Sequence, residues 1–227
     1  MNIILSDGTL YSLNTSVPFI REHFSNPINH AITILNQINE GLYTDFIDEE
    51  DKVIVDCGAN IGLFSIYASG MAEQVVSVEP TPSHFNILQE LTKDFENISP
   101  INCAIGANMG KIKFYFSNSN TTMNSLIQRD GEEIEVDCFD LKGIVSEFNL
   151  DKIDFLKIDI EGSEKYFLNE NNLLYLQNKV KKFFIEFHEV DGKSYSQIRE
   201  EFIPIFSSLG FDVNKISVDA LFCKKYK

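Results

Sequence analysis

The sequence predicts an α/β fold, a largely parallel sheet with helices on both of its faces. In residues 52–69, a short apolar run, a turn bracketed by glycines and an apolar pattern of helical spacing follow one another. Further apolar runs alternate with helical patterns along the rest of the chain. Several runs end in acidic residues, at the strand ends where such sheets bind their ligands.

The length of 227 residues suits one main domain. We expect residues 1–50 to form an extension packed on the core, with a hairpin over residues 3–13 and a helix over residues 26–41. An Asp-Gly pair favours the hairpin turn, and an Asn-Pro pair is typical of a helix start. Residues 51–227 then form the main domain as a single globular unit.

The main domain is expected to alternate strands and helices, with its last two strands paired antiparallel. A polar segment, residues 118–125, is expected to order over the substrate as a lid. The expected strands are residues 53–55, 75–78, 101–105, 111–116, 133–136, 153–160, 183–187, 211–216 and 220–223, and the expected helices are 61–68, 82–91, 139–148 and 196–209.

The turn after the first core strand differs from the dinucleotide-binding fingerprint. Gly58 and Gly62 bracket it, but Asn60 replaces the middle glycine and Asp56 precedes the turn. The Asp56 carboxylate would repel a pyrophosphate and suits a cationic or amino-bearing ligand. Because glycine lets backbone approach closely, we expect this loop to contact a ligand. An ordinary strand-to-helix turn without a ligand is the alternative.

The second core strand ends at Glu79, about 20 residues after the glycine turn. Nucleoside-binding α/β domains hold a ribose diol with an acid at this place. The combination of Asp56 with Glu79 favours S-adenosylmethionine over NAD as the cofactor. The alternative for Glu79 is a solvated strand end.

Two further strand ends carry candidate catalytic groups. Strand alternation predicts that Asp159 and Glu161 share one side after the fourth core strand, and that Glu186 and His188 share one face after the fifth. Histidine has the ordinary pKa of a general base near neutrality. The alternatives are a charged strand exit with Glu164 as a helix cap, and a structural histidine.

Composition argues against several classes of partner. The formal net charge is −15, from 34 acidic and 19 basic residues, so we expect no nucleic-acid or anionic-membrane partner. We detect no signal peptide and no apolar run long enough to cross a bilayer. The four cysteines are scattered singly, as expected for reduced, buried thiols in a cytoplasmic protein.

Six segments occur in the order and spacing of one known family. They read VIVDCGANIG, VVSVEPTPSHFNIL, INCAIG, EIEVDCFDL, FLKIDIEGSEKYFL and FFIEFHE. From about residue 52 to residue 189, the chain resembles the FkbM family of S-adenosylmethionine-dependent methyltransferases. The resemblance implies a Rossmann-like, seven-stranded sheet whose last strand is antiparallel. It also implies O-methylation, with a free hydroxyl of a sugar, glycan or secondary metabolite as the acceptor.

The resemblance also assigns roles to particular residues. It places Asp56, Gly58, Asn60 and Gly62 around the methionine end of the cofactor. It places Glu79 at the ribose, and Cys103, Ala104 and Ile105 at the wall beside the adenine.

A hydroxyl is a weak nucleophile, so a base within reach assists methyl transfer. The candidates are Asp159, Glu161 and His188, with His188 favoured as the proton acceptor. We assign no metal site, although the acids could instead bind a divalent ion that gathers two substrate oxygens. The competing functions are an NAD-dependent oxidoreductase and a non-catalytic cofactor-binding module. The sequence identifies neither the acceptor nor the oligomeric state.

Overall fold

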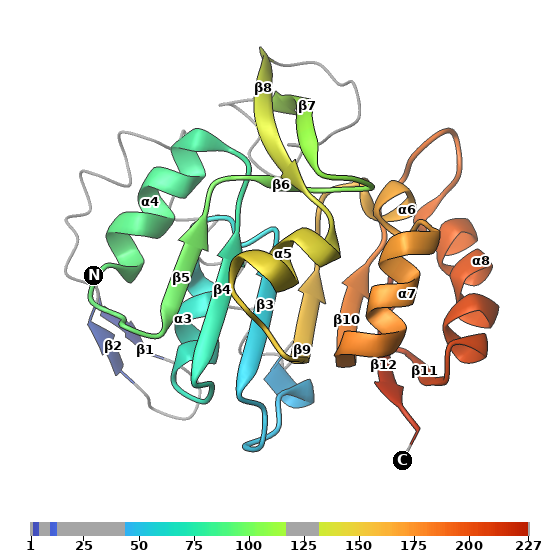
Figure 1. Ribbon diagram of the computed structural model, residues 1–227, viewed down its shortest axis with the longest axis horizontal. Helices are drawn as coiled ribbons and strands as arrows, with labels where there is room; N and C mark the ends of the chain where they lie inside the picture. Colours follow the sequence, from blue (N-terminus) through green and yellow to red (C-terminus); the bar gives the residue numbers. More distant parts are fainter. Residues whose placement is uncertain (1, 5–9, 13–43, 117–131, 227) are drawn as a thin grey trace.

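A seven-stranded sheet forms the centre of the molecule (Figure 1). The computed structural model describes residues 2–4, 10–12, 44–116 and 132–226. The strand order is β11-β12-β10-β9-β3-β4-β5. The five neighbouring strands β10, β9, β3, β4 and β5 pair in parallel. The last strand, β12, pairs antiparallel with both β10 and β11, as the resemblance implied. The strands are β3 (Val53–Cys57), β4 (Gln74–Val78), β5 (Ile98–Ile101), β9 (Ile153–Ile158), β10 (Val180–Glu186), β11 (Phe211–Lys215) and β12 (Ala220–Lys225).

Helices cover both faces of this sheet, because neighbouring residues of each buried strand point to opposite sides. Ile54 packs in a core with α3 (Leu63–Ser69) and α4 (Pro82–Thr92). Val55 packs in a second core with the three helices α5 (Leu141–Glu147), α7 (Glu170–Lys179) and α8 (Tyr195–Ser208). None of the helices in the described ranges is long and apolar enough to cross a bilayer.

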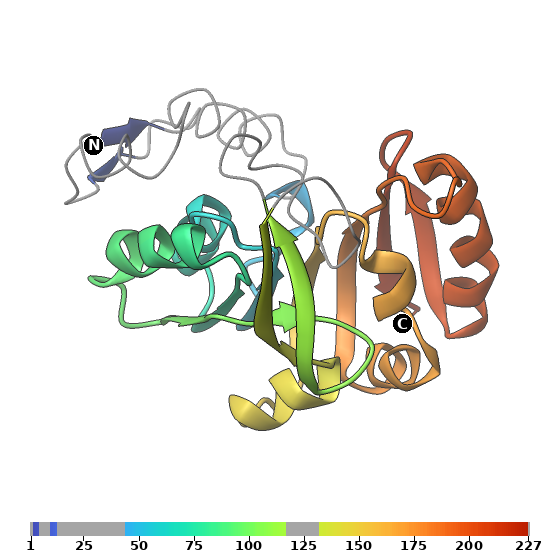
Figure 2. The ribbon, with the colours of Figure 1, turned by 90° about the horizontal axis from the view of Figure 1, so that it is seen from above.

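A smaller sheet, in the order β6-β8-β7, stands at one edge of the molecule (Figures 1 and 2). Its strands are β6 (Ala104–Ile105), β7 (Gly110–Phe116) and β8 (Glu132–Phe139). The single strand predicted over residues 101–105 is therefore wrong, since β5 and β6 belong to different sheets. Between them, the Asn102 amide donates to the carbonyl oxygens of Glu79 and Pro80 and turns the chain out of the main sheet.

Two further predictions near the site need correction. Strand β9 ends at Ile158 instead of residue 160, so Asp159 and Glu161 lie beyond the strand and its alternation does not orient them. The helices α6 (Glu164–Phe167) and α7 were not predicted. Helix α7 buries only Asn172 and Leu176, so its sequence carries little helical periodicity.

The N-terminal hairpin is confirmed in its two strands. Strand β1 (Asn2–Ile4) pairs antiparallel with β2 (Leu10–Ser12), in the register Asn2 to Ser12. The next described element is the short 3-10 helix η1 (Thr44–Phe46), which precedes β3. The predicted helix over residues 26–41 and the predicted lid over residues 118–125 lie outside the described residues.

Candidate active site

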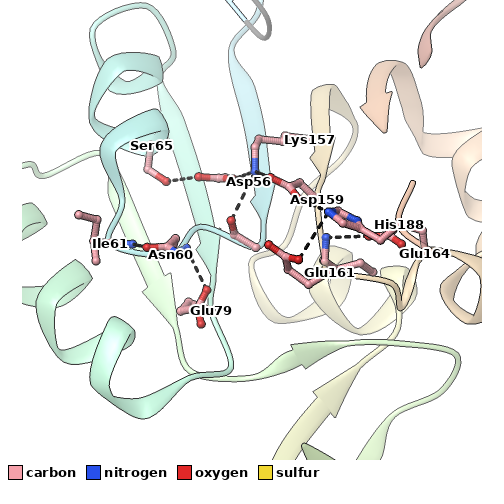
Figure 3. A network of polar contacts seen from close by, with 12 residues as sticks. Asp56, Asn60, Ile61, Ser65, Glu79, Lys157, Asp159, Glu161, Glu164 and His188 are labelled. Atoms are coloured by element: carbon pink, nitrogen blue, oxygen red, sulfur yellow. Dashed lines mark hydrogen bonds and ion pairs between the residues drawn. The ribbon is translucent and has the colours of Figure 1, made fainter. Parts of the chain in front are cut away.

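The polar side chains singled out in the sequence gather where β3, β4, β9 and β10 end (Figure 3). Asp56 lies in β3 and Glu79 directly follows β4, while Asp159 and Glu161 follow β9. His188 follows β10, on the far side of β9 from β3. The carboxyl edge of a parallel sheet thus collects groups from four strands.

The loop after β3 is held against its neighbours by backbone contacts. The N–H groups of Gly58 and Ala59 both donate to the Val78 carbonyl oxygen, at 3.0 and 2.9 Å. Gly58 has φ +82°, and a Cβ there would lie 1.8 Å from the Asp159 carbonyl oxygen. Glycine is therefore needed at this position because the loop touches the exit of β9. The sequence suggested a ligand as the reason for the glycine, and the structure adds this intramolecular one.

Asp56 lies beneath the loop, fully buried. Its Oδ2 accepts a hydrogen bond of 2.7 Å from Ser65, whose hydroxyl accepts one of 2.7 Å from Ser77. Its Oδ1 lies 3.4 Å from the Lys157 ammonium and accepts no hydrogen bond from the described residues. Burial raises the pKa of Asp56, against the opposing effects of Lys157 and Ser65. Direct contact between Asp56 and a cofactor stays a prediction.

Glu79 is held rigidly at the end of β4, with 5% of its surface exposed. One carboxylate oxygen accepts from the N–H of Asn60 at 2.9 Å, and the other from the N–H of Thr81 at 2.8 Å. Burial raises the pKa of Glu79 to about 7, although these hydrogen bonds oppose the shift. The Thr81 side chain also hydrogen-bonds this carboxylate. A fixed, nearly dry carboxylate of this kind fits the hydroxyls of a ribose.

Lys157 links the β3 end to the acids after β9. Its ammonium lies 3.4 Å from Asp56 and 3.2 Å from Asp159, and the side chain is almost fully buried. Burial lowers the pKa of Lys157, but the two carboxylates outweigh it and raise the pKa above its ordinary value. The lysine is a charged bridge between the cofactor-side acid and the catalytic candidates.

Asp159, Glu161 and His188 form a cluster at the surface of the site. The His188 Nε2 lies 3.5 Å from Glu161 Oε2 and 3.9 Å from Asp159 Oδ1. Glu161 has φ +55°, a left-handed conformation that is uncommon outside glycine and turns its side chain toward the histidine. The sequence correctly predicted that these residues meet, although strand alternation was the wrong reason for the two acids.

Glu164 has a larger role than the helix cap that its sequence position indicated. It is 1% exposed, and its Oε1 accepts from the N–H groups of Ile160 and Gly162, at 3.1 and 3.2 Å. The same oxygen lies 3.0 Å from His188 Nδ1. Glu164 therefore holds both the left-handed turn and the histidine ring. Its closeness to two other acids was the only sequence signal for this role.

These contacts set the charge of the cluster. Burial disfavours the charged His188 ring, but the carboxylates of Glu164, Asp159 and Glu161 outweigh burial and raise the pKa of His188 to about 10. Burial and the neighbouring Asp159 raise the pKa of Glu161 to about 8. At neutral pH the histidine is therefore a cation, and Glu161 can exchange a proton.

The proposed adenine wall belongs to the smaller sheet and the residue before it. Cys103 precedes β6, which consists of Ala104 and Ile105, and all three side chains are buried. Their contact with a cofactor stays a prediction, as it does for the turn residues Gly58, Asn60 and Gly62.

A family model described as the methyltransferase FkbM domain matches residues 56–213, well over half of the chain. Two curated relatives are similar. Methyltransferase sdnD of Sordaria araneosa is 26% identical over 201 residues, which cover 71% of this chain and 74% of that protein. Methyltransferase 1 of Beauveria bassiana (strain ARSEF 2860) is 27% identical over 141 residues, which cover 51% of this chain and 56% of that protein.

A solved structure of the fibrillarin/Nop5p complex has a similar fold. The TM-score is 0.53 at 14% sequence identity, and the match covers 100% of this chain and 97% of the matched chain. This similarity concerns the arrangement of the sheet and its helices.

Proposed function

Because the chain belongs to the FkbM methyltransferase domain family, we propose that it methylates a hydroxyl group of a sugar, a glycan or another small molecule. Its cofactor is S-adenosylmethionine, which supplies an electrophilic methyl group when bound. The protein must then hold the cofactor, align the acceptor oxygen, exclude water and provide a place for the departing proton.

Glu79 is the residue best placed to hold the cofactor. Its carboxylate is fixed by the N–H groups of Asn60 and Thr81, so it can accept from two ribose hydroxyls without being reoriented. The loop that carries Asn60 is itself tied to β4 through Val78. These contacts support a preorganised binding edge that runs from β3 to β4.

The cluster of Asp159, Glu161 and His188 is the observation that supports a hydroxyl acceptor. A hydroxyl needs a proton acceptor during transfer, and Asp159 and Glu161 are carboxylates with partly exposed side chains. The sequence analysis favoured His188 for this role. The charge of the ring at neutral pH favours Asp159 instead, or Glu161 in its ionised form, with His188 stabilising the oxygen as negative charge develops on it.

The state of the cysteines supports the proposal that the protein functions in a reducing compartment. All four are unpaired and buried, namely Cys57, Cys103, Cys138 and Cys223. Proteins of oxidising compartments typically pair their cysteines. We therefore place the enzyme in the cytoplasm.

The test is a methyl-transfer screen. The protein is incubated with S-adenosylmethionine carrying a labelled methyl group and a panel of sugars, glycans and small alcohols, and mass spectrometry locates the methyl group. Glu161→Gln should lower kcat by about 10²–10⁴-fold while keeping affinity for S-adenosylhomocysteine. Glu189→Gln, which alters an exposed acid beside His188, is the matched control. Transfer to amines or thiols, with no hydroxyl methylated, would contradict the proposal.

A further inference from the structure

Two carboxylates and one imidazole converge at the edge formed by the ends of β9 and β10. Asp159, Glu161 and His188 each offer one ligand atom, and these atoms all lie within 4.8 Å of one another. From this convergence, the geometry points to a divalent-cation site that gathers the oxygen atoms of the acceptor. The inference rests on the proposed function, because the cation would bind the hydroxyl acceptor that the proposed function assumes.

The distances suit a common centre. Around a six-coordinate cation with ligands at about 2.1–2.2 Å, neighbouring ligand atoms lie about 3 Å apart and opposite ones about 4.3 Å. The His188 Nε2 is 3.5 Å from Glu161 Oε2 and 3.9 Å from Asp159 Oδ1. Both distances lie between these two values, so small side-chain movements would bring the three atoms to ligand distance of one ion.

Glu164 supplies the outer support that a ligating histidine normally has. Metal-binding imidazoles hold their second ring nitrogen against a carboxylate or a carbonyl, which fixes the ring and its tautomer. Glu164, nearly fully buried, lies 3.0 Å from His188 Nδ1. This contact leaves Nε2 directed at the two acids, as Figure 3 shows. A chance grouping of surface acids does not require such a buried support.

The charges at this edge favour a cation. The carboxylates of Asp159, Glu161, Glu164 and Glu186 interact with one another here. In the described part of the chain, Lys157 is the lysine that faces them, and Asp56 shares it. With the His188 ring charged as well, the acids still outnumber the positive charges, and a bound ion would replace the proton on His188 Nε2. A divalent ion would offset this excess while leaving coordination positions open for acceptor oxygens.

The donor set indicates which ion to test. Two carboxylates and one imidazole leave an octahedral ion three open positions, and Mn²⁺ accepts both oxygen and imidazole nitrogen. Each carboxylate contributes one oxygen to the ion. Glu161 keeps its second oxygen for the acceptor proton, whereas the second oxygen of Asp159 lies 3.2 Å from Lys157. A monodentate arrangement therefore remains compatible with a proton-accepting role of Glu161.

The experiment measures Mn²⁺ binding to the full chain after removal of metals with a chelator. Electron paramagnetic resonance and calorimetry should show one Mn²⁺ per chain. Asp159→Asn, Glu161→Gln and His188→Gln should each weaken binding at least tenfold, and Glu164→Gln about 10–100-fold. Glu189→Gln, an exposed acid outside the cluster, should bind like the unmodified protein. Equal Mn²⁺ affinity in all five variants would overturn the inference.

A second measurement avoids variants that do not fold. In the unmodified protein, Mn²⁺ should broaden the His188 ring signals in the nuclear magnetic resonance spectrum before those of His84, the ring near Glu79. Equal broadening of both rings would also overturn the site.

The two proposals fail in different ways. Full methyl transfer in a chelator, without Mn²⁺ binding, removes the cation site and leaves the methyltransferase. Variant-sensitive Mn²⁺ binding without any methylated hydroxyl supports the cation site and removes the proposed acceptor class.

Discussion

The ammonium of Lys157 neutralises part of the negative charge of two neighbouring acids of the site. It lies between Asp56, which is fully buried, and Asp159, at 3.4 and 3.2 Å. Removing one member of a buried ion pair leaves an uncompensated charge, which costs far more than the net value of the pair. Two acids depend on this one lysine, so its loss affects both stability and the position of a catalytic candidate.

Lys157→Met should therefore lower the free energy of unfolding by about 3–5 kcal/mol, as is typical of broken buried pairs. Urea denaturation followed by circular dichroism measures this change. Adding Asp56→Asn to the variant should recover part of the loss, since it removes one of the orphaned charges. A single variant with unchanged stability would show that Asp56 and Asp159 do not need the lysine.

The environment of Glu79 predicts a pH-dependent cofactor affinity. Its pKa is raised to about 7, chiefly by burial, and ribose hydroxyls donate to its ionised form. As pH falls below 7 the carboxylate takes up a proton, and binding must expel that proton at a cost. Affinity for S-adenosylhomocysteine should therefore be about tenfold higher at pH 8 than at pH 6. Calorimetry at several pH values measures it.

Two variants separate Glu79 from its neighbours. Glu79→Gln should weaken binding at pH 8 by about 1–3 kcal/mol and abolish the pH dependence. His84→Gln should keep the dependence, although its Nδ1 lies 3.7 Å from Glu79 Oε1. A pH dependence that survives in Glu79→Gln would assign the titration to another group.

At the scale of elements, the loop after β3 contacts both β4 and the residues that follow β9. Its N–H groups bond the Val78 carbonyl, and Gly58 touches the Asp159 backbone. The Asp159 N–H in turn donates to the Cys57 carbonyl at 3.1 Å. The loop after β3 and the turn after β9 are therefore joined directly, and a displacement of one moves the other.

Gly58→Ala should disturb both regions. The new Cβ would meet the Asp159 carbonyl oxygen at 1.8 Å, in a backbone conformation of φ +82°. Gly192→Ala is the matched control, with φ +72° and no atom within 4 Å of the added Cβ. Each substitution costs about 1–2 kcal/mol for the left-handed backbone, and Gly58→Ala should cost about 1–3 kcal/mol more for the overlap.

Chemical denaturation and binding of S-adenosylhomocysteine provide the measurements for this pair. The Gly58 variant should lose affinity for the ligand, and the Gly192 variant should keep it. Equal stability and equal ligand affinity of the two variants would mean that the loop after β3 accommodates the added Cβ without loss of either.

At the scale of the whole molecule, the edge that we assign to the cofactor receives residues from β3, β4 and the turn before β6. A ligand that binds the folded state alone raises the stability of the entire domain by mass action. The domain should therefore respond as a unit to an adenosyl ligand.

S-adenosylhomocysteine at about 100 times its dissociation constant should stabilise the protein by about 2.7 kcal/mol. For a domain of this size, this corresponds to a rise in Tm of about 5–10 °C. NAD at the same concentration should leave the Tm unchanged, because Asp56 and Asn60 do not suit a pyrophosphate. Differential scanning calorimetry makes the comparison, and stabilisation by NAD alone would revive the oxidoreductase alternative.

Apart from α6, α7 and the split between β5 and β6, the sequence by itself determined the order of elements in the main domain and the strand ends that carry the candidate groups. The pattern from residue 52 to residue 69 and the acid at Glu79 are local signals, since periodicity, glycines and strand-end acids are read from neighbouring residues. The meeting of Asp159, Glu161 and His188 also followed, because parallel strands end at one edge.

Only the tertiary structure decided what each of these groups contacts. Glu164 reaches His188 across 24 positions of sequence, and Lys157 reaches the carbonyl oxygen of Gly58 across 99. Such contacts depend on how β3, β9 and β10 are placed side by side. They set the protonation of His188, because burial and neighbouring charges, which no local pattern records, determine the pKa of a buried group.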